Sequence, residues 1–181
     1  MNPDEIARRA RGVRLVTLDV DGVLTDGRIY VDDDGREFKA YSALDGQGIK
    51  MLQRAGIEVA WITGSDAASV RHRAKHLGVA HLVMGASHKV EAWERLRATL
   101  GIAAQACAHM GDDLPDVPLL AASGLAISVP HAPQSVRRHA HYVTQRDGGS
   151  GAVREAAELI LQAQDRLADA ESAHTSPPGG P

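Results

Sequence analysis

The sequence is poor in cysteine and in long apolar segments. Cys107 is the one cysteine among 181 residues, so no disulfide can form within the chain. This usage is typical of a reducing compartment, and no charged and then apolar signal segment opens the sequence, so we expect a cytoplasmic protein. No apolar run approaches the roughly 18 residues that a membrane-spanning helix requires, so we expect no membrane partner.

The chain also has few aromatic residues and no large excess of charge of either sign. Phe, Trp and Tyr make up 3% of the chain, and 20 Lys and Arg face 23 Asp and Glu, which gives a net charge of −3. A nucleic-acid-binding protein usually carries a basic surface and aromatic side chains on which bases stack. We therefore expect no nucleic-acid partner, and the remaining composition is that of an ordinary globular domain.

Short apolar segments alternate along the chain with segments of helical pattern. Strands are expected at residues 14–18, 57–62, 81–84, 106–110, 125–129 and 142–144. Helices are expected at residues 48–55, 67–77, 89–100, 114–122 and 151–168. Several of these helices are followed by a glycine, which can end a helix in the left-handed conformation. The alternation predicts an α/β protein with a Rossmann-like parallel sheet and helices on both of its faces.

One insertion interrupts this alternation. Residues 27–41 carry alternating apolar side chains on either side of Asp34 and Gly35, a pattern typical of a β-hairpin. An isolated two-stranded ribbon is marginal in water, so its apolar side chains need a partner surface. The ends, residues 1–12 and 170–181, are polar or rich in small residues, so we expect flexible termini around a single domain at 13–169.

Polar side chains gather where the predicted strands end. Seven of them follow four strands: Asp19, Asp21, Thr63, Lys89, Asp112, Asp113 and Asp116. In an open parallel sheet, ligands bind beyond the carboxyl ends of the strands. Several carboxylates at one edge repel one another unless a cation lies between them, and all-oxygen ligands with room for phosphate favour Mg²⁺. The sequence therefore predicts a magnesium site at this edge.

Four segments at these positions carry a resemblance to a known superfamily. DVDGVLT, ITG, a lone lysine before a helix, and GDDLPD resemble, in this order, the motifs of the haloacid dehalogenase-like phosphohydrolases. The hairpin in place of a large cap domain and the segments LDGQGI and GGSGAVRE further resemble the 3-deoxy-D-manno-octulosonate 8-phosphate phosphatase family. The resemblance covers about residues 13–164. It implies Mg²⁺-dependent hydrolysis of that phosphorylated sugar acid through an aspartyl-phosphate, a step of lipopolysaccharide core sugar biosynthesis.

The resemblance also implies a role for each acidic residue of the first and fourth motifs. Asp19 would be the nucleophile and a metal ligand. Asp21 would act as general acid and base and contact the substrate, and its backbone carbonyl would be a second metal ligand. Asp112 would supply the remaining carboxylate to the metal, with Asp113 and Asp116 supporting it by holding waters and neighbouring groups.

The second and third motifs and a further set of residues would contact substrate. By resemblance, Thr63 would bind a phosphate oxygen, and Lys89 would also bind substrate and neutralise charge in the transition state. The residues expected to face the sugar acid are Ser42, Ala43, Leu44, Asp45, Gly46, Lys50, Ser65 and Arg73. At Lys50 and Ser65 the family commonly has arginine, and a bidentate clamp on a carboxylate is weaker without it.

The family forms homotetramers in which a neighbouring subunit helps to close each site. We therefore expect a homotetramer assembled through the hairpin, with residues 148–155 near a neighbour's site. Two alternatives stay open: the same chemistry on a related sugar acid such as a nonulosonate 9-phosphate, and a non-catalytic subunit with the same fold.

Each of three further features has a structural interpretation beside a functional one. His72 and His76 have the spacing of metal ligands on a helix, but no third ligand accompanies them, so a solvated helix face is favoured. Cys107 lies in an apolar strand and is expected in the core. Arg154 and Glu155 fit a helix surface and a neighbour's active site equally well.

Overall fold

Six parallel strands form the central sheet in the order β5-β4-β1-β6-β7-β8. The strands are β1 (Leu15–Leu18), β4 (Glu58–Ile62), β5 (His81–Val83), β6 (Cys107–Met110), β7 (Leu125–Ser128) and β8 (Tyr142–Val143). Leu15 of β1 lies between Glu58 of β4 and Cys107 of β6. The chain moves from β1 to β4 and β5 on one side and then returns to β6 on the other. This reversal of strand order places a ligand-binding crevice at the carboxyl ends of β1 and β6.

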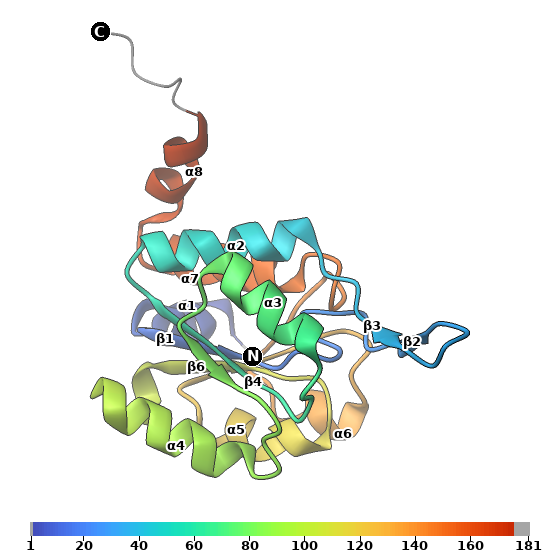
Figure 1. Cartoon of the computed structure of the whole chain (residues 1–181). Helices are drawn as coiled ribbons and strands as arrows, with labels where there is room; N and C mark the ends of the chain where they lie inside the picture. Colours follow the sequence, from blue (N-terminus) through green and yellow to red (C-terminus); the bar gives the residue numbers. More distant parts are fainter. Residues whose placement is uncertain (1, 176–181) are drawn as a thin grey trace, which may run out of the picture.

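Helices cover both faces of this sheet in the computed structural model, which describes residues 2–175 (Figure 1). One layer contains α1 (Pro3–Arg11), α2 (Ala43–Arg54), α3 (Ala68–Leu77) and α7 (Ala152–Ala163). The opposite layer contains α4 (Lys89–Leu100) and α5 (Val117–Ala122). The shorter helices are η1 (Ala104–Ala106), η2 (Leu114–Asp116) and α6 (Gln134–Arg137). The predicted fold class is confirmed. No helix within residues 2–175 combines the length and the apolar character needed to span a bilayer.

The central strands β1, β6 and β7 are buried along their whole length. Successive side chains point to opposite sides of a sheet, so both faces of these strands are covered. Val16 and Trp61 pack in the larger core with the layer of α2 and α7, whereas Leu15 packs with Trp93 of α4. Cys107 is fully buried in this second core, and burial raises the pKa of its thiol to about 11. The cysteine is therefore a packing residue, as its apolar strand predicts.

The predicted hairpin is present and projects from the body of the domain (Figure 1). Its strands β2 (Tyr30–Val31) and β3 (Glu37–Phe38) are antiparallel, and the rings of Tyr30 and Phe38 stack with centroids 5.3 Å apart. Three apolar residues of this ribbon are more than half exposed: Ile29 (78%), Val31 (55%) and Phe38 (54%).

The N-terminal residues depart from the prediction of a flexible segment at 1–12. Residues 3–11 form α1, and the side chain of Asn2 caps it by accepting a hydrogen bond from the amide of Asp4. Arg9 Nη1 donates to the carbonyl of Gly124 at 2.7 Å, and Ala10 is fully buried. Packing against α7, rather than composition, stabilises this short polar helix.

The C-terminal helix of the sequence prediction is divided in two. α7 ends at Ala163, because Asp165 adopts the left-handed conformation with a φ of 56°, and α8 (Leu167–Thr175) follows. The predicted flexible tail at 170–181 is therefore helical as far as Thr175, and its last residues, 176–181, lie outside the described residues.

The helix predicted at 48–55 begins five residues earlier, at Ala43. Ser42 caps it, because its hydroxyl accepts hydrogen bonds from the amides of Leu44 and Asp45. Gly46 and Gly48 therefore lie inside the helix rather than before it.

Candidate active site

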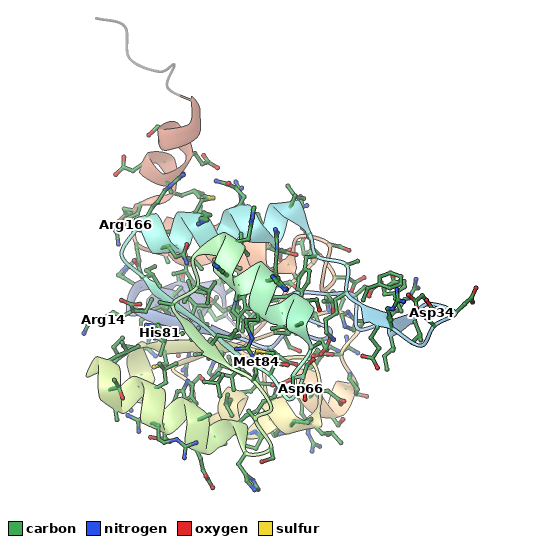
Figure 2. The ribbon with its side chains drawn as sticks, in the orientation of Figure 1. Arg14, Asp34, Asp66, His81, Met84 and Arg166 are labelled. Atoms are coloured by element: carbon green, nitrogen blue, oxygen red, sulfur yellow. The ribbon has the colours of Figure 1, made fainter. Side chains whose placement is uncertain are left out.

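A cavity of about 560 Å³ opens at the carboxyl ends of β1, β4 and β6. In Figure 2, Arg14 and His81 mark the amino-terminal edge of the sheet, Asp66 lies toward the opposite edge, and Asp34 lies at the hairpin tip. The predicted motif residues that line the cavity are Asp19, Asp21, Thr63, Ser65, Lys89, Asp112, Asp113 and Asp116. The hairpin adds a wall to it with Arg28, Ile29, Glu37 and Lys39.

Lys89 lies at the floor of the cavity between two carboxylates. Its Nζ is 2.8 Å from Asp19 Oδ1 and 2.7 Å from Asp116 Oδ1. All three residues are buried, so water screens these charges little. Burial alone favours the neutral amine, but the two carboxylates outweigh it and raise the pKa of Lys89. The structure therefore places a permanent positive charge directly beside Asp19.

Asp19 and Asp112 have the properties of ligands for a hard cation. Burial, with repulsion from Asp116 added to it, raises the pKa of each carboxyl to about 7. Asp112 Oδ1 is buried and has no hydrogen-bond partner among the described residues. Oxygen atoms of Asp19, Asp112 and Asp116 all lie within 4.8 Å of one another. A divalent cation bound by oxygen would neutralise this cluster, so the donor set fits Mg²⁺.

Asp116 differs from these two carboxylates because donors occupy both of its oxygens. Oδ1 is 2.7 Å from Lys89 Nζ and 3.3 Å from His109 Nε2, and Oδ2 accepts from the amides of Asp112 and Asp113 at 3.2 and 3.3 Å. Burial raises the pKa of Asp116, but the donors and charges of His109 and Lys89 outweigh it and lower this pKa to about 2. Asp116 is therefore a fixed anion that organises its neighbours, rather than a free metal ligand.

Asp21 lies higher in the cavity and contacts the hairpin. Lys39, directly after β3, places its Nζ 2.5 Å from Asp21 Oδ1, and 13% of the Lys39 side chain is exposed. Beside them, Gly22 has a φ of 92°, and a Cβ at this position would lie 2.0 Å from Asp112 Oδ2. Glycine is therefore required where the loop after β1 passes Asp112.

Thr63 and Ser65 form the wall that follows β4. The buried Thr63 hydroxyl accepts a hydrogen bond from the amide of Ser65 at 3.0 Å, and the Ser65 hydroxyl accepts from the amide of Ala67 at 3.3 Å. Since the Thr63 oxygen accepts in this contact, its proton is available to an oxygen in the cavity.

The segment predicted to face the sugar acid lies outside the cavity, because α2 begins there. The residues concerned are Ser42, Ala43, Leu44, Asp45 and Gly46. The buried Asp45 carboxylate accepts hydrogen bonds from the amides of Gly151 and Arg154 at 3.2 and 3.0 Å. It thus caps the start of α7, and it joins the LDGQGI and GGSGAVRE segments within one chain.

Lys50 and Arg73 also lie outside the cavity. Lys50 Nζ would be 3.4 Å from a Cβ on Gly78, at the C-terminal end of α3. Arg73 Nη2 donates to the carbonyl of Ser42 at 3.2 Å, and its guanidinium lies 5.8 Å from the centre of the Tyr41 ring. Both side chains lie between α2 and α3, and neither lines the cavity in this chain.

Three basic side chains near the site were missed by sequence reasoning. Lys39 lines the cavity, and His131 lies beside it, with Nε2 3.8 Å from Asp112 Oδ2 and Nδ1 3.2 Å from Asp147 Oδ1. His109 lies beneath the cavity against Asp116. Lys39 could have been predicted, because a hairpin inserted after β1 must bring its second strand back close to the end of β1. The histidines stand outside any motif.

The remaining features make contacts within the chain or with solvent. Glu155 accepts hydrogen bonds from the Tyr142 hydroxyl at 2.7 Å and from two backbone amides, and Arg154 pairs with Glu158 at 2.6 Å. The predicted solvated face at His72 and His76 is confirmed, because both are exposed.

Comparison with known proteins agrees with this chemistry. A profile of the haloacid dehalogenase-like hydrolases matches residues 75–155. The 3-deoxy-D-manno-octulosonate 8-phosphate phosphatase KdsC of Yersinia pestis is 46% identical over 164 residues, which cover 91% of this chain and 88% of that protein. The protein of the same name from Escherichia coli (strain K12) is 43% identical, with coverage of 92% and 89%. A crystal structure of the Moraxella catarrhalis phosphatase in complex with magnesium, phosphate and KDO matches with a TM-score of 0.91 and 42% identity, covering 96% of this chain and 99% of that chain.

Fold, site chemistry and profile agree on the class of protein, a haloacid dehalogenase-like hydrolase. The relatives define it more narrowly, and the chain belongs to the 3-deoxy-D-manno-octulosonate 8-phosphate phosphatase family.

Proposed function

We propose that the protein hydrolyses 3-deoxy-D-manno-octulosonate (KDO) 8-phosphate to KDO and inorganic phosphate, in the biosynthesis of the lipopolysaccharide core sugar. The observation that carries the phosphoryl chemistry is the buried cation of Lys89 beside Asp19, in one cavity with an Asp112 oxygen that lacks a partner among the described residues. This is the chemistry that transfer of a dianionic phosphoryl group requires. The proposed sugar acid is supported by the similarity to the phosphatases named above.

Asp19 is the proposed nucleophile. Its carboxylate attacks phosphorus, the bond from phosphorus to the sugar oxygen breaks, and an aspartyl-phosphate forms. In its protonated form Asp21 gives a proton to the leaving sugar oxygen, which leaves the carboxylate that pairs with Lys39. Asp21 then takes a proton from the water that attacks phosphorus, which releases phosphate and restores the Asp19 carboxylate.

Lys89 and Thr63 are proposed to bind the oxygens of the phosphoryl group. Lys89 is held by Asp19 and Asp116, so its charge is in place before the reaction begins and little reorganisation is required. The Thr63 hydroxyl, with its oxygen accepting from the amide of Ser65, donates to a phosphoryl oxygen.

Asp19, Asp112 and the backbone carbonyl of Asp21 would hold Mg²⁺. When bound, the ion supplies positive charge that offsets the repulsion between the carboxylates and polarises the phosphoryl oxygens. Asp113, at the rim, supports this site.

The sugar acid is proposed to lie toward the hairpin. Arg28 and Lys39 supply positive charge on that side of the cavity, and Ser65 lines it as well. Lys50, Arg73 and the segment 42–46 contribute through the position of α2 rather than by direct contact within this chain.

We propose a homotetramer in which the hairpins of several subunits pack together. The exposed Ile29 and Val31 supply the apolar surface for this contact, and covering it would shield the cavity from water. Residues 148–155 of a neighbour would lie near each site. A cytoplasmic location is proposed on the chemistry of Cys107, a buried free thiol.

A panel of phosphorylated sugar acids tests the identity of the substrate. We expect the highest kcat/KM for KDO 8-phosphate, with a nonulosonate 9-phosphate as the closest competitor. A higher kcat/KM for the nine-carbon compound would contradict the proposed substrate and leave the phosphatase chemistry intact.

A further inference from the structure

One buried titratable side chain takes no part in the proposed chemistry. His109 of β6 is fully buried on the sheet face that α4 and α5 cover. Its Nε2 lies 3.3 Å from Asp116 Oδ1, and its Nδ1 lies 2.9 Å from the hydroxyl of Thr17 on the adjacent strand β1. The Thr17 hydroxyl also donates to the carbonyl of Ala108 at 3.1 Å. Both ring nitrogens thus have a polar partner at a depth that water does not reach.

The partners determine how this ring is held. A carboxylate offers only lone pairs, so Nε2 carries a proton and donates it to Asp116. The Thr17 hydroxyl has one proton and two lone pairs. While it donates to the Ala108 carbonyl it can accept from a protonated Nδ1, and it pairs with an unprotonated Nδ1 only by giving up that donation. The imidazole is therefore fixed from both sides, and its Nε2 proton is aimed at Asp116.

Asp116 transmits this constraint to the active site. His109 and Lys89 share its Oδ1, while two backbone amides hold its Oδ2. Lys89 Nζ in turn lies 2.8 Å from Asp19 Oδ1. Without His109, Oδ1 retains Lys89 alone, and rotation of the carboxylate would move the ammonium relative to Asp19.

We propose that Thr17 and His109 position Lys89 for phosphoryl transfer by holding Asp116 in place. His109 contacts neither Asp19 nor the cavity, so it is a positioning residue rather than a catalytic one. The inference rests on the proposed function in one respect only, namely that Lys89 acts on the phosphoryl group.

The competing interpretation is that His109 is an ordinary core residue with satisfied hydrogen bonds. Such a residue would affect stability and leave turnover of the folded enzyme unchanged. A positioning residue lowers kcat at nearly constant KM, because Lys89 acts on charge that develops in the transition state. It is also rescued by a side chain that restores the donor.

The test compares three variants with the wild-type enzyme. His109→Leu removes the donor to Asp116 and is expected to lower kcat by about 10–100-fold, the usual effect of losing a supporting hydrogen bond in a site of this kind. His109→Gln places an amide donor near the position of Nε2 and is expected to recover most of this loss. Thr17→Val keeps the volume but removes the hydroxyl, and a smaller loss of kcat, about 3–10-fold, is expected from the weaker support. KM should stay within about threefold throughout.

Ser123→Ala is the matched control. The buried Ser123 hydroxyl also donates to a carbonyl, that of Leu119 at 2.7 Å, but neither residue is hydrogen-bonded to the side chain of His109, Asp116 or Lys89. It should lower the melting temperature and leave kcat unchanged. The inference is overturned if His109→Gln is as impaired as His109→Leu, or if Thr17→Val is as active as Ser123→Ala. Each variant is compared with wild type on the sugar phosphate that the wild-type enzyme prefers. If that compound is not KDO 8-phosphate, the proposed substrate is wrong, but the comparison between variants still tests the role of His109.

Discussion

Lys39 of the hairpin and Asp21 of the loop after β1 form an ion pair, with Nζ 2.5 Å from Oδ1. The pair joins the inserted ribbon to the carboxylate that is proposed to move protons. Because most of the Lys39 side chain is buried in this contact, the hairpin supplies charge to the cavity as well as a wall.

Replacement of Lys39 by Met should impair catalysis without unfolding the protein. Lys39 holds the Asp21 carboxyl group in place, so its loss should misplace a reacting group and lower kcat/KM by roughly 10–100-fold. Arg36→Met at the exposed turn of the same hairpin is the control, since Arg36 pairs there with Asp32 and Asp34 and does not line the cavity. Equal activity of the two variants in steady-state assays would remove Lys39 from the site.

Mg²⁺ should stabilise the protein more at pH 8 than at pH 5.5. The pKa of Asp19 and of Asp112 is raised from 3.8 to about 7 in the folded protein without metal. Their contribution to stability is therefore fully present below about pH 4 and is lost as the pH rises through 7. Mg²⁺ binds the ionised pair, so its effect grows over the same interval, and binding near pH 7 releases protons.

Differential scanning calorimetry with and without Mg²⁺ at the two pH values measures this effect. Asp112→Asn should abolish most of the Mg²⁺-induced rise in melting temperature. An equal rise at both pH values, or an undiminished rise in Asp112→Asn, would contradict the assignment of the metal site.

Asp45→Ala should lower stability rather than substrate affinity. The carboxylate caps α7 through the amides of Gly151 and Arg154, and loss of such a cap costs about 0.5–2 kcal/mol. Urea unfolding should show this loss while KM stays close to that of wild type. Unchanged stability together with a raised KM would return Asp45 to the sugar-contact role that the family resemblance implies.

Replacement of both Ile29 and Val31 by Asp should dissociate the proposed homotetramer. Light scattering of the wild-type protein is expected to give four times the mass of the 19.2 kDa chain. The double variant should be smaller, because charged side chains cannot be buried unpaired between hairpins, and kcat/KM should fall with it. A fully active monomer, before or after this change, would show that the hairpin does not complete the site by assembly.

Much of the fold was predictable because the pattern of each element is local. Short apolar segments that alternate with helical patterns predicted the parallel sheet. The carboxyl ends of parallel strands share an edge, which is why Asp19, Thr63 and Asp112 were expected together. Helix α1 was not predictable in this way, because the burial of Ala10 depends on contact with α7, far away in the sequence.

The start of α2 was missed for a related reason. Gly46 and Gly48 usually disfavour a helix, but here each allows a close approach from another element. A Cβ on Gly46 would lie 2.6 Å from Arg73 Nη2, and one on Gly48 would lie 2.7 Å from Arg154 Cα. His109 was missed because its partner Thr17 lies on a different strand.

The central claim is that Asp19 carries out phosphoryl transfer at a magnesium site. The most direct measurement is phosphate release from KDO 8-phosphate by wild type, Asp19→Asn and Asp21→Asn, each with Mg²⁺ and with EDTA. We expect release by wild type that EDTA abolishes, no turnover by Asp19→Asn because an amide is a poor nucleophile, and a loss of about 10²–10⁴-fold for Asp21→Asn. Release by Asp19→Asn at the wild-type rate, or release that is insensitive to EDTA, would contradict the account.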